Sequence, residues 1–307
     1  MSAAMLAPRE FARSPEALAA RHNLAEAERY TRWLATHHYE NFHVASLLLP
    51  RKLHQDFFNV YAYCRWADDL ADEMGGREES LRLLEWWRGE LDAMYAGCVK
   101  HPVFVALQAT VERHGIPAEP FADLVRAFVQ DQNVTRYATR ADLLAYCRYS
   151  ANPVGRLVLY LCGYADAQRQ RLSDATCTAL QLANFWQDVA VDLEKGRVYL
   201  PLEDLDRHGC ALEDVLARRA TPAFRSVIRA EVDWARELFL EGLPLARMVN
   251  RRLAVDIDLF SRGGMRVLEK IERLDYDVLS RRPVVSKSER VRLLLASVVR
   301  HALSRAA

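Results

Sequence analysis

The sequence predicts an all-α protein with one helical domain over residues 15–307 and a flexible segment over residues 1–14. Apolar residues recur at helical spacing through nearly the whole chain, and no alternating run bounded by turns is present. Glycine and proline mostly fall between the periodic stretches. With 307 residues, 51% of them hydrophobic, the chain is long enough to bury a large core.

Helical periodicity predicts ten helices, most of them ended by a glycine or a proline. The predicted helices span about residues 15–39, 51–74, 77–97, 102–114, 118–132, 140–162, 168–193, 221–248, 250–274 and 287–304.

Pro153 interrupts the predicted helix over 140–162, because proline lacks an amide hydrogen and clashes with the preceding turn. Its neighbours Ser150, Ala151 and Gly155 are small. The resulting kink either opens space beside a cavity or serves ordinary helix packing, and both interpretations stay open.

Charge and cysteine content exclude several classes of protein. Lysine and arginine total 42 against 41 aspartate and glutamate, so the formal net charge of +1 gives no bulk attraction to nucleic acid. The six cysteines form no C-x-x-C pair, which indicates reduced thiols rather than a disulfide framework or zinc site. No signal peptide is visible, and the longest apolar run, Leu157 to Cys162, is too short to span a bilayer. We therefore expect a cytoplasmic protein.

The C-terminal stretch 281–307 is basic, with seven arginine or lysine residues and a single acid, Glu289. A basic amphipathic helix can rest on an anionic membrane surface, here the cytoplasmic face of the inner membrane. The alternative is a terminal helix docked on the core with a solvated basic face. The apolar residues on periodic positions are Leu293, Leu294, Leu295, Val298, Val299 and Leu303.

Two carboxylate pairs of equal spacing carry the functional signal. In the first, Asp68 and Asp72 follow Tyr61 and Arg65 at spacings of four, three and four, so all share one helical stripe. Two carboxylates on one face repel each other unless a cation lies between them. Mg²⁺ suits such a pair, because it takes one or two carboxylates and completes its shell with water and phosphate oxygens. Taken alone, the pattern equally fits a solvated acidic face.

The second pair, Asp188 and Asp192, follows Gln181 and Asn184 at spacings of three, four and four. Acids and amides beside apolar residues are costly to bury without a partner. The repeated spacing favours a functional site over a charged surface. Two such helices facing each other would hold a diphosphate through Mg²⁺. The apolar flank consists of Leu180, Leu182, Phe185 and Val189.

Lys195, Arg197 and Tyr199 follow the second pair across a turn at Gly196. Arginine binds phosphate through two parallel hydrogen bonds, and lysine acts as a point charge. Both cations could instead complement the negative end of the helix dipole. We favour this alternative for Lys195 and diphosphate contact for Arg197.

These motifs resemble those of the squalene/phytoene synthase family, the head-to-head prenyl synthases. The resemblance covers about residues 24–275 and rests on YAYCRWADDLADE (61–73), YCRYSANPVGRLV (146–158) and NFWQDVAVDLEKGRVYLP (184–201). It implies the isoprenoid synthase fold, in which two D-x-x-x-D motifs face each other across a central active-site cavity.

Three local features are similar to the hopanoid-pathway branch called hydroxysqualene synthase: ENFHVAS (40–46), SANPVGR (150–156) and NFWQDV (184–189). This resemblance implies conversion of presqualene diphosphate and water into hydroxysqualene and diphosphate, without NADPH. The absence of G-x-G-x-x-G also weakens a nicotinamide-dependent reaction. The implied partners are the prenyl diphosphate and neighbouring pathway enzymes.

The resemblance also assigns residue roles. It implies that two or three Mg²⁺ ions are held by Asp68, Asp72, Asp188, Asp192 and Asn184. It implies that the diphosphate and the reacting chain are contacted by Tyr61, Arg65, Asn184, Gln187, Arg197, Tyr199 and Phe42, with Tyr61, Arg65 and Tyr199 expected to be catalytic. Phe42, Tyr61 and Tyr199 are the aromatic residues expected to stabilise a carbocation, whereas Phe185 and Trp186 are expected in the core.

Two positions depart from the family pattern. Gln187 precedes Asp188 where condensing relatives commonly carry a basic residue in an N-I-L-R-D run, which fits an enzyme that handles a single diphosphate leaving group. His43 stands where this branch often has proline, and no consequence is assigned to it. The alternatives are a presqualene diphosphate, squalene or phytoene synthase that condenses two prenyl diphosphates such as farnesyl diphosphate, and a non-catalytic helical assembly protein.

Overall fold

The computed structural model describes residues 5–37 and 50–303, and within them the regular structure is helical apart from one isolated bridge between Arg136 and Val198. This confirms the predicted all-α class. The chain forms two compact units. One consists of Met1–Asn133 with Arg156–Ala165, and the other of Val134–Gly155 with Asp166–Ala307. One continuous domain over 15–307 stays a prediction.

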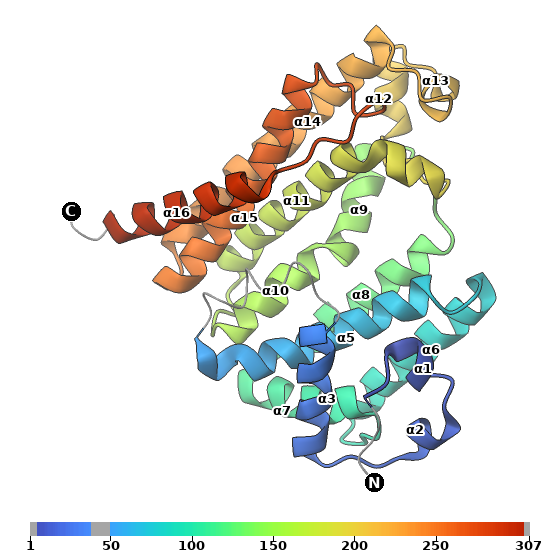
Figure 1. Ribbon diagram of the computed structural model, residues 1–307, viewed down its shortest axis with the longest axis vertical. Coiled ribbons are helices and arrows are strands. Elements are labelled where there is room, and N and C mark those ends of the chain that lie inside the picture. The colour runs from blue at the N-terminus through green and yellow to red at the C-terminus, as the bar shows by residue number, and fades with distance from the viewer. Residues whose placement is uncertain (1–4, 38–49, 304–307) are drawn as a thin grey trace. The chain divides into compact units, whose positions relative to one another are not determined.

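The helices of the first unit are coloured blue to green in Figure 1. They are α1 (Pro8–Phe11), α2 (Pro15–Ala19), α3 (Leu24–His37), the 3₁₀ helix η1 (Arg51–Leu53), α5 (His54–Asp72), α6 (Arg77–Tyr95), α7 (Pro102–His114) and α8 (Glu119–Asp131). Helix α10 (Asn152–Leu161) starts in the second unit and ends in the first.

The remaining helices belong to the second unit and run from green to red in Figure 1. They are α9 (Arg140–Ser150), α11 (Ala167–Glu194), α12 (Leu202–Arg207), α13 (Leu212–Leu216), α14 (Pro222–Gly242), the 3₁₀ helix η2 (Leu243–Arg247), α15 (Arg251–Arg273) and α16 (Lys287–Leu303).

Helix α5 lies at the centre of the first unit, in contact with α3, α6, α7 and α8. Its buried face carries Tyr63 and Trp66, and the Trp66 ring stacks on Trp87 of α6 with centroids 5.1 Å apart. Burial of large aromatic side chains contributes most of the packing energy of such a core. The first aspartate pair is therefore carried by a rigidly packed helix.

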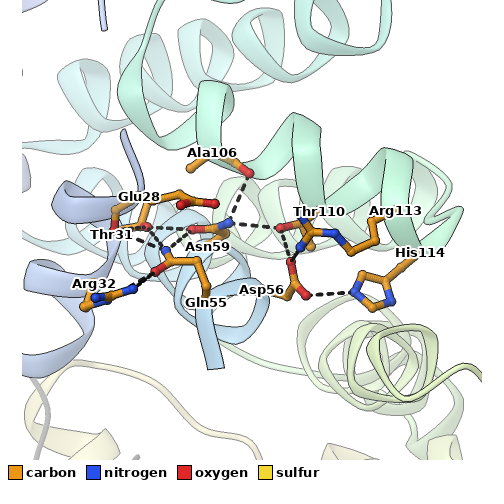
Figure 2. A network of polar contacts seen from close by, with 10 residues as sticks. All are labelled: Glu28, Thr31, Arg32, Gln55, Asp56, Asn59, Ala106, Thr110, Arg113 and His114. Atoms are coloured by element: carbon orange, nitrogen blue, oxygen red, sulfur yellow. Dashed lines mark hydrogen bonds and ion pairs between the residues drawn. The ribbon is translucent and has the colours of Figure 1, made fainter. Parts of the chain in front are cut away.

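A buried polar network ties α5 to α3 and α7 (Figure 2). The Asp56 carboxylate is 1% exposed and accepts hydrogen bonds from Thr110 at 3.0 Å, Arg113 at 2.5 Å and His114 at 2.9 Å. One turn later, the side chain of Asn59 bonds to Thr31, the Ala106 carbonyl and Thr110. Buried polar groups satisfied in this way fix the register of the helices.

The N-terminal part differs from the prediction in two ways. The helix predicted over 15–39 is two helices, because Asn23 and Glu26 form a capping box that starts α3 at Leu24. Helix α1 lies inside the segment predicted to be flexible, and its Phe11 is 1% exposed within the core. A single buried aromatic residue orders this segment, and helical periodicity cannot reveal so short an element.

In the second unit, α11 packs against α9, α14 and α15. Two glycines allow close approach: a Cβ at Gly242 would lie 2.1 Å from the Thr176 hydroxyl, and one at Gly264 would lie 2.2 Å from the ring of Phe239. The second aspartate pair therefore also lies on a tightly packed helix.

The predicted break at Pro153 is confirmed. The helix predicted over 140–162 ends at Ser150 and restarts at Asn152, which places Pro153 in a first turn where a missing amide hydrogen costs little. A Cβ on Gly155 would lie 2.3 Å from the Ser173 hydroxyl and 2.5 Å from the Cys177 sulfur. The small residue thus serves close helix packing.

The helix predicted over 221–248 ends at Gly242 and continues as the 3₁₀ helix η2. The other predicted helices are confirmed within a few residues, and α7 spans 102–114 as predicted. The short helices α12 and α13 were not predicted, because five or six residues give no resolvable period. All six cysteines are free thiols, as expected. Among the described helices, none is both long enough and apolar enough to cross a membrane.

Candidate active site

The first aspartate pair lies at the C-terminal end of α5. The Asp68 side chain is 46% exposed and Asp72 is exposed, whereas the neighbouring Leu70 and Ala71 are buried. The C-terminus of a helix is the negative end of its dipole, so the helix itself does not stabilise these acids. The position therefore favours an external cation.

Arg65 contacts three acidic residues at this end of α5. Its guanidinium lies 3.2 Å from Asp68, 2.5 Å from Asp69 and 3.4 Å from Glu73. Asp69, which faces inward, is 4% exposed, and burial raises its pKa to about 7 against the opposing charge of Arg65. Arg65 is therefore the counter-ion of this acidic cluster. Its contact with a diphosphate stays a prediction, and so does the role of the half-buried Tyr61.

The second pair lies in the last two turns of α11. Asp188 is 15% exposed and Asp192 is half-buried. Of the apolar flank, Leu182, Phe185 and Val189 are buried, and Leu180 is half-buried. Burial, followed by the charge of Asp188, raises the pKa of Asp192 to about 6, and Lys195 and Arg197 oppose this shift. Asn184, one turn earlier, is exposed.

Arg282 is the residue that sequence reasoning missed. It lies in the connection between α15 and α16, where its Nε and Nη2 atoms contact the two carboxylate oxygens of Asp188, the latter at 3.1 Å. From the sequence, Arg282 was interpreted only as one of the basic residues of the C-terminal stretch 281–307. Its place directly before Pro283, in a segment with no helical pattern, was the available signal.

Gln187 holds the same connection, since its Nε2 atom donates a hydrogen bond to the Pro283 carbonyl. The side chain predicted to mark a missing phosphate contact therefore positions the segment that carries Arg282. Figure 1 shows this red connection passing over α11 before α16 begins.

The turn after α11 brings the two basic residues back toward the acids. The amides of Lys195 and Arg197 both donate to the Asp192 carbonyl, at 3.0 and 2.9 Å, and Gly196 adopts a φ of 72° that favours glycine. Lys195 is exposed and Arg197 is half-buried.

Tyr199 belongs to a buried stack of four aromatic rings. Its ring lies 3.8 Å from Phe185, nearly parallel at 9°, and also stacks on Tyr137 and Tyr146. The pairing of Tyr199 with Phe185 was not predicted; Trp186, with no exposed surface, lies in the core as expected. Phe42, His43 and the segment 40–46 lie outside the described residues.

The aspartates fit Mg²⁺ by the chemistry of their donors. In the described part of the chain, no three histidine, cysteine, aspartate or glutamate side chains gather as a metal cluster. Mg²⁺ needs only one or two carboxylates together with water and phosphate oxygens, and each pair supplies two. That the pairs on α5 and α11 face each other stays a prediction.

A helical fold with paired aspartates on two packed helices is the architecture expected of an isoprenoid synthase. The model of the family described as "Squalene/phytoene synthase" matches residues 35–289. The chain therefore belongs to the squalene/phytoene synthase family, whose members are enzymes that process prenyl diphosphates.

Individual relatives point to two branches. The chain is 47% identical to the squalene synthase HpnC from Alicyclobacillus acidocaldarius, with 82% of this chain and 95% of that structure covered and a TM-score of 0.80. It is 35% identical to a phytoene synthase of Thermus thermophilus, with 84% and 87% covered. A dehydrosqualene synthase structure at 24% identity, covering 90% and 97%, has the same fold with a TM-score of 0.80.

Proposed function

We propose that the chain is a hydroxysqualene synthase. In the reaction, the bond between carbon and the diphosphate oxygen of presqualene diphosphate breaks and the carbocation rearranges. Water then adds to carbon and loses a proton, which yields hydroxysqualene and diphosphate. The observation that carries the proposal is that both aspartate pairs are intact on packed helices, and the 47% identity to HpnC supports the choice of branch.

We assign Mg²⁺ binding to the two aspartate pairs with Asn184; when bound, Mg²⁺ neutralises charge that develops on the departing diphosphate. Arg197 would orient the diphosphate through parallel N–H donors. Arg65 and Tyr61 would do the same beside the first pair. Arg282 occupies both oxygens of the Asp188 carboxylate in the metal-free protein, where it would compete with Mg²⁺.

Carbocation chemistry needs an apolar surface that keeps water out until rearrangement is complete. The buried, stacked rings of Tyr199 and Phe185 supply such an apolar surface on the second unit. We assign Tyr199 to the border of the reacting chain, with Phe42 as its predicted counterpart. The reaction as written consumes no reductant, so it needs no NADPH.

The second candidate is a synthase that condenses two prenyl diphosphates. The 35% identity to a phytoene synthase supports it. Against it, the residue directly before Asp188 is the uncharged Gln187, whose amide is engaged with Pro283. The positive charge at Asp188 comes from Arg282 instead. A non-catalytic assembly role is disfavoured because all four aspartates are present.

Product analysis separates these candidates. The purified chain with Mg²⁺ is given presqualene diphosphate or farnesyl diphosphate, each with and without NADPH. Hydroxysqualene formed only from presqualene diphosphate, independently of NADPH, is the expected result. Conversion of farnesyl diphosphate alone into presqualene diphosphate or squalene would overturn the assignment.

We also propose that the chain works in the cytoplasm beside the enzymes that make its prenyl diphosphate and consume its product. A product this poorly soluble in water favours direct transfer to the next enzyme.

A further inference from the structure

Helix α16 packs with polar residues on its inward side. The helix lies beside α15 in Figure 1. Among its residues whose burial the structure describes, 287–301, the buried ones are Glu289 and Ser297. A surface helix ordinarily turns its apolar stripe toward the core and its polar side toward water. In this helix the inward stripe is mixed, with the half-buried Leu293 between the buried Glu289 and Ser297.

The inward contacts are ionic. The Glu289 carboxylate lies 2.6 Å from Arg266 and 2.8 Å from Lys270, both on α15. Hydrogen bonds from Lys270, Ser286 and Arg266 hold the pKa of Glu289 well below its usual range. Salt bridges and capping thus help to dock α16 on α15, and two leucines of the helix, Leu293 and Leu294, are half-buried beside them.

Four other apolar residues of α16 point outward. Val291, Leu295, Val298 and Val299 have exposed fractions of 56%, 59%, 37% and 54%. At 100° per residue these four positions cover about 100° of one side of the helix, a continuous apolar row. Contiguous exposed apolar surface of this kind marks an interaction site.

The charges around the row have one sign. Lys287, Arg290 and Arg292 are exposed, whereas the exposed Arg300 falls by helical angle on the side of Glu289. Glu289, the one acid of the helix, is already neutralised on the inner side. Lys287 and Arg292 flank the apolar row, because each lies about 20° beyond one of its two edges at 100° per residue. The outward surface is therefore apolar in the middle and purely basic at its edges.

We propose that this outward face of α16 binds the surface of an anionic phospholipid bilayer. The apolar row would enter the boundary between headgroups and acyl chains, and the flanking cations would lie at the level of the lipid phosphates. A second copy of the chain fits less well, because a twofold contact through this face would bring the two basic edges together. The proposal does not depend on which product the enzyme makes, since binding needs no substrate.

Vesicle flotation tests the proposal with the full-length chain. Vesicles of phosphatidylglycerol and phosphatidylcholine are compared with vesicles of phosphatidylcholine alone, at low and at high salt. We expect binding to the anionic vesicles that weakens strongly with salt. The variant Val291→Ser/Leu295→Ser/Val299→Ser should bind about tenfold more weakly, and Arg290→Gln/Arg292→Gln should lose much of the salt dependence.

Matched controls keep the test specific. Leu240→Ser on α14 and Phe260→Ser on α15 remove residues that are 55% and 45% exposed outside the row, and both should leave binding unchanged. Circular dichroism checks that each variant is folded. Equal binding to neutral vesicles, unchanged binding of the triple variant, or light scattering that shows a dimer broken by the triple variant would each overturn the proposal.

Discussion

The guanidinium of Arg282 contacts both carboxylate oxygens of Asp188, although 94 residues separate them. Asp188 is one of the two acids through which the second motif would hold Mg²⁺. A side chain of the protein therefore supplies positive charge to this carboxylate when no metal is bound. The contact makes the connection between α15 and α16 part of the candidate site.

Arg282→Gln is expected to raise the affinity of the substrate-free protein for Mn²⁺, a probe of the Mg²⁺ site. A cation that competes for Asp188 is removed, and a half-exposed ion pair worth about 1 kcal/mol corresponds to about a fivefold change. Electron paramagnetic resonance of free Mn²⁺ measures this directly. Arg281→Gln, at the exposed neighbouring position, is the control, and an unchanged or weaker affinity in Arg282→Gln would contradict the prediction.

Loss of one carboxylate from either pair should abolish most of the activity. Asp68→Asn and Asp188→Asn are expected to lower kcat about a hundredfold or more, because charge on the leaving diphosphate loses its stabilisation. The matched controls are Asp92→Asn and Asp233→Asn. These side chains are 59% and 60% exposed, and each pairs with an arginine of its own helix. Full turnover in either motif variant would refute the metal-binding assignment.

The buried Asp56 network in Figure 2 should dominate the local stability of the first unit. Asp56→Asn removes the charge that Arg113 and His114 contact inside the protein and should lower the free energy of unfolding by about 3 kcal/mol. Arg113→Gln should lower it by less than about 1 kcal/mol, because the Arg113 side chain is 53% exposed. Urea unfolding distinguishes the two, and equal losses would contradict the prediction.

Asp256 on α15 should make stability fall as pH rises. Burial raises its pKa to about 8 from an ordinary value of 3.8, so between these values the folded protein holds a proton that the unfolded chain releases. The contribution of Asp256 to stability is then highest below pH 4, declines up to about pH 8 and levels off above it. Asp256→Asn removes this decline. Between pH 5 and pH 9, its free energy of unfolding should rise by about 2 kcal/mol relative to that of the parent.

Asp258 provides the opposite sign on the same helix. Burial alone would raise its pKa, but the hydrogen bond from Arg262, the nearby Ser297 hydroxyl and the charges of Arg262 and Arg300 lower it. Its contribution to stability is present above the unfolded pKa and is lost as pH falls through the folded pKa. Asp258→Asn should therefore be destabilising at pH 7, with a smaller effect at acid pH. Urea unfolding at several pH values measures both variants, and parallel pH profiles would sink the prediction.

Two adjacent glycines of α15 should respond in opposite ways to alanine. A Cβ at Gly264 would meet the Phe239 ring at 2.2 Å and Leu180 at 3.0 Å, whereas nothing lies within 4 Å at Gly263. Gly264→Ala should cost about 1–3 kcal/mol through overpacking. Gly263→Ala should be neutral or stabilise the helix by up to about 1 kcal/mol. Thermal unfolding of the pair checks this, and similar melting temperatures would contradict it.

Local signals determined much of this protein from its sequence. Period, proline and glycine predicted α7 to the residue and the break before Pro153, because helix formation and helix ends depend on neighbours within a few positions. The spacing of Asp68 with Asp72 and of Asp188 with Asp192 was also legible, since side chains four apart share a helical face. The family followed from the motifs around these pairs.

Tertiary structure decided what each helical face meets. It turned Asp69 inward and left its neighbour Asp68 exposed, brought Arg282 to Asp188, and placed Glu289 rather than the valines of α16 against α15. A helical period states which residues share a stripe, but not which stripe is buried. That choice depends on packing and on charges many residues away, which no local pattern records.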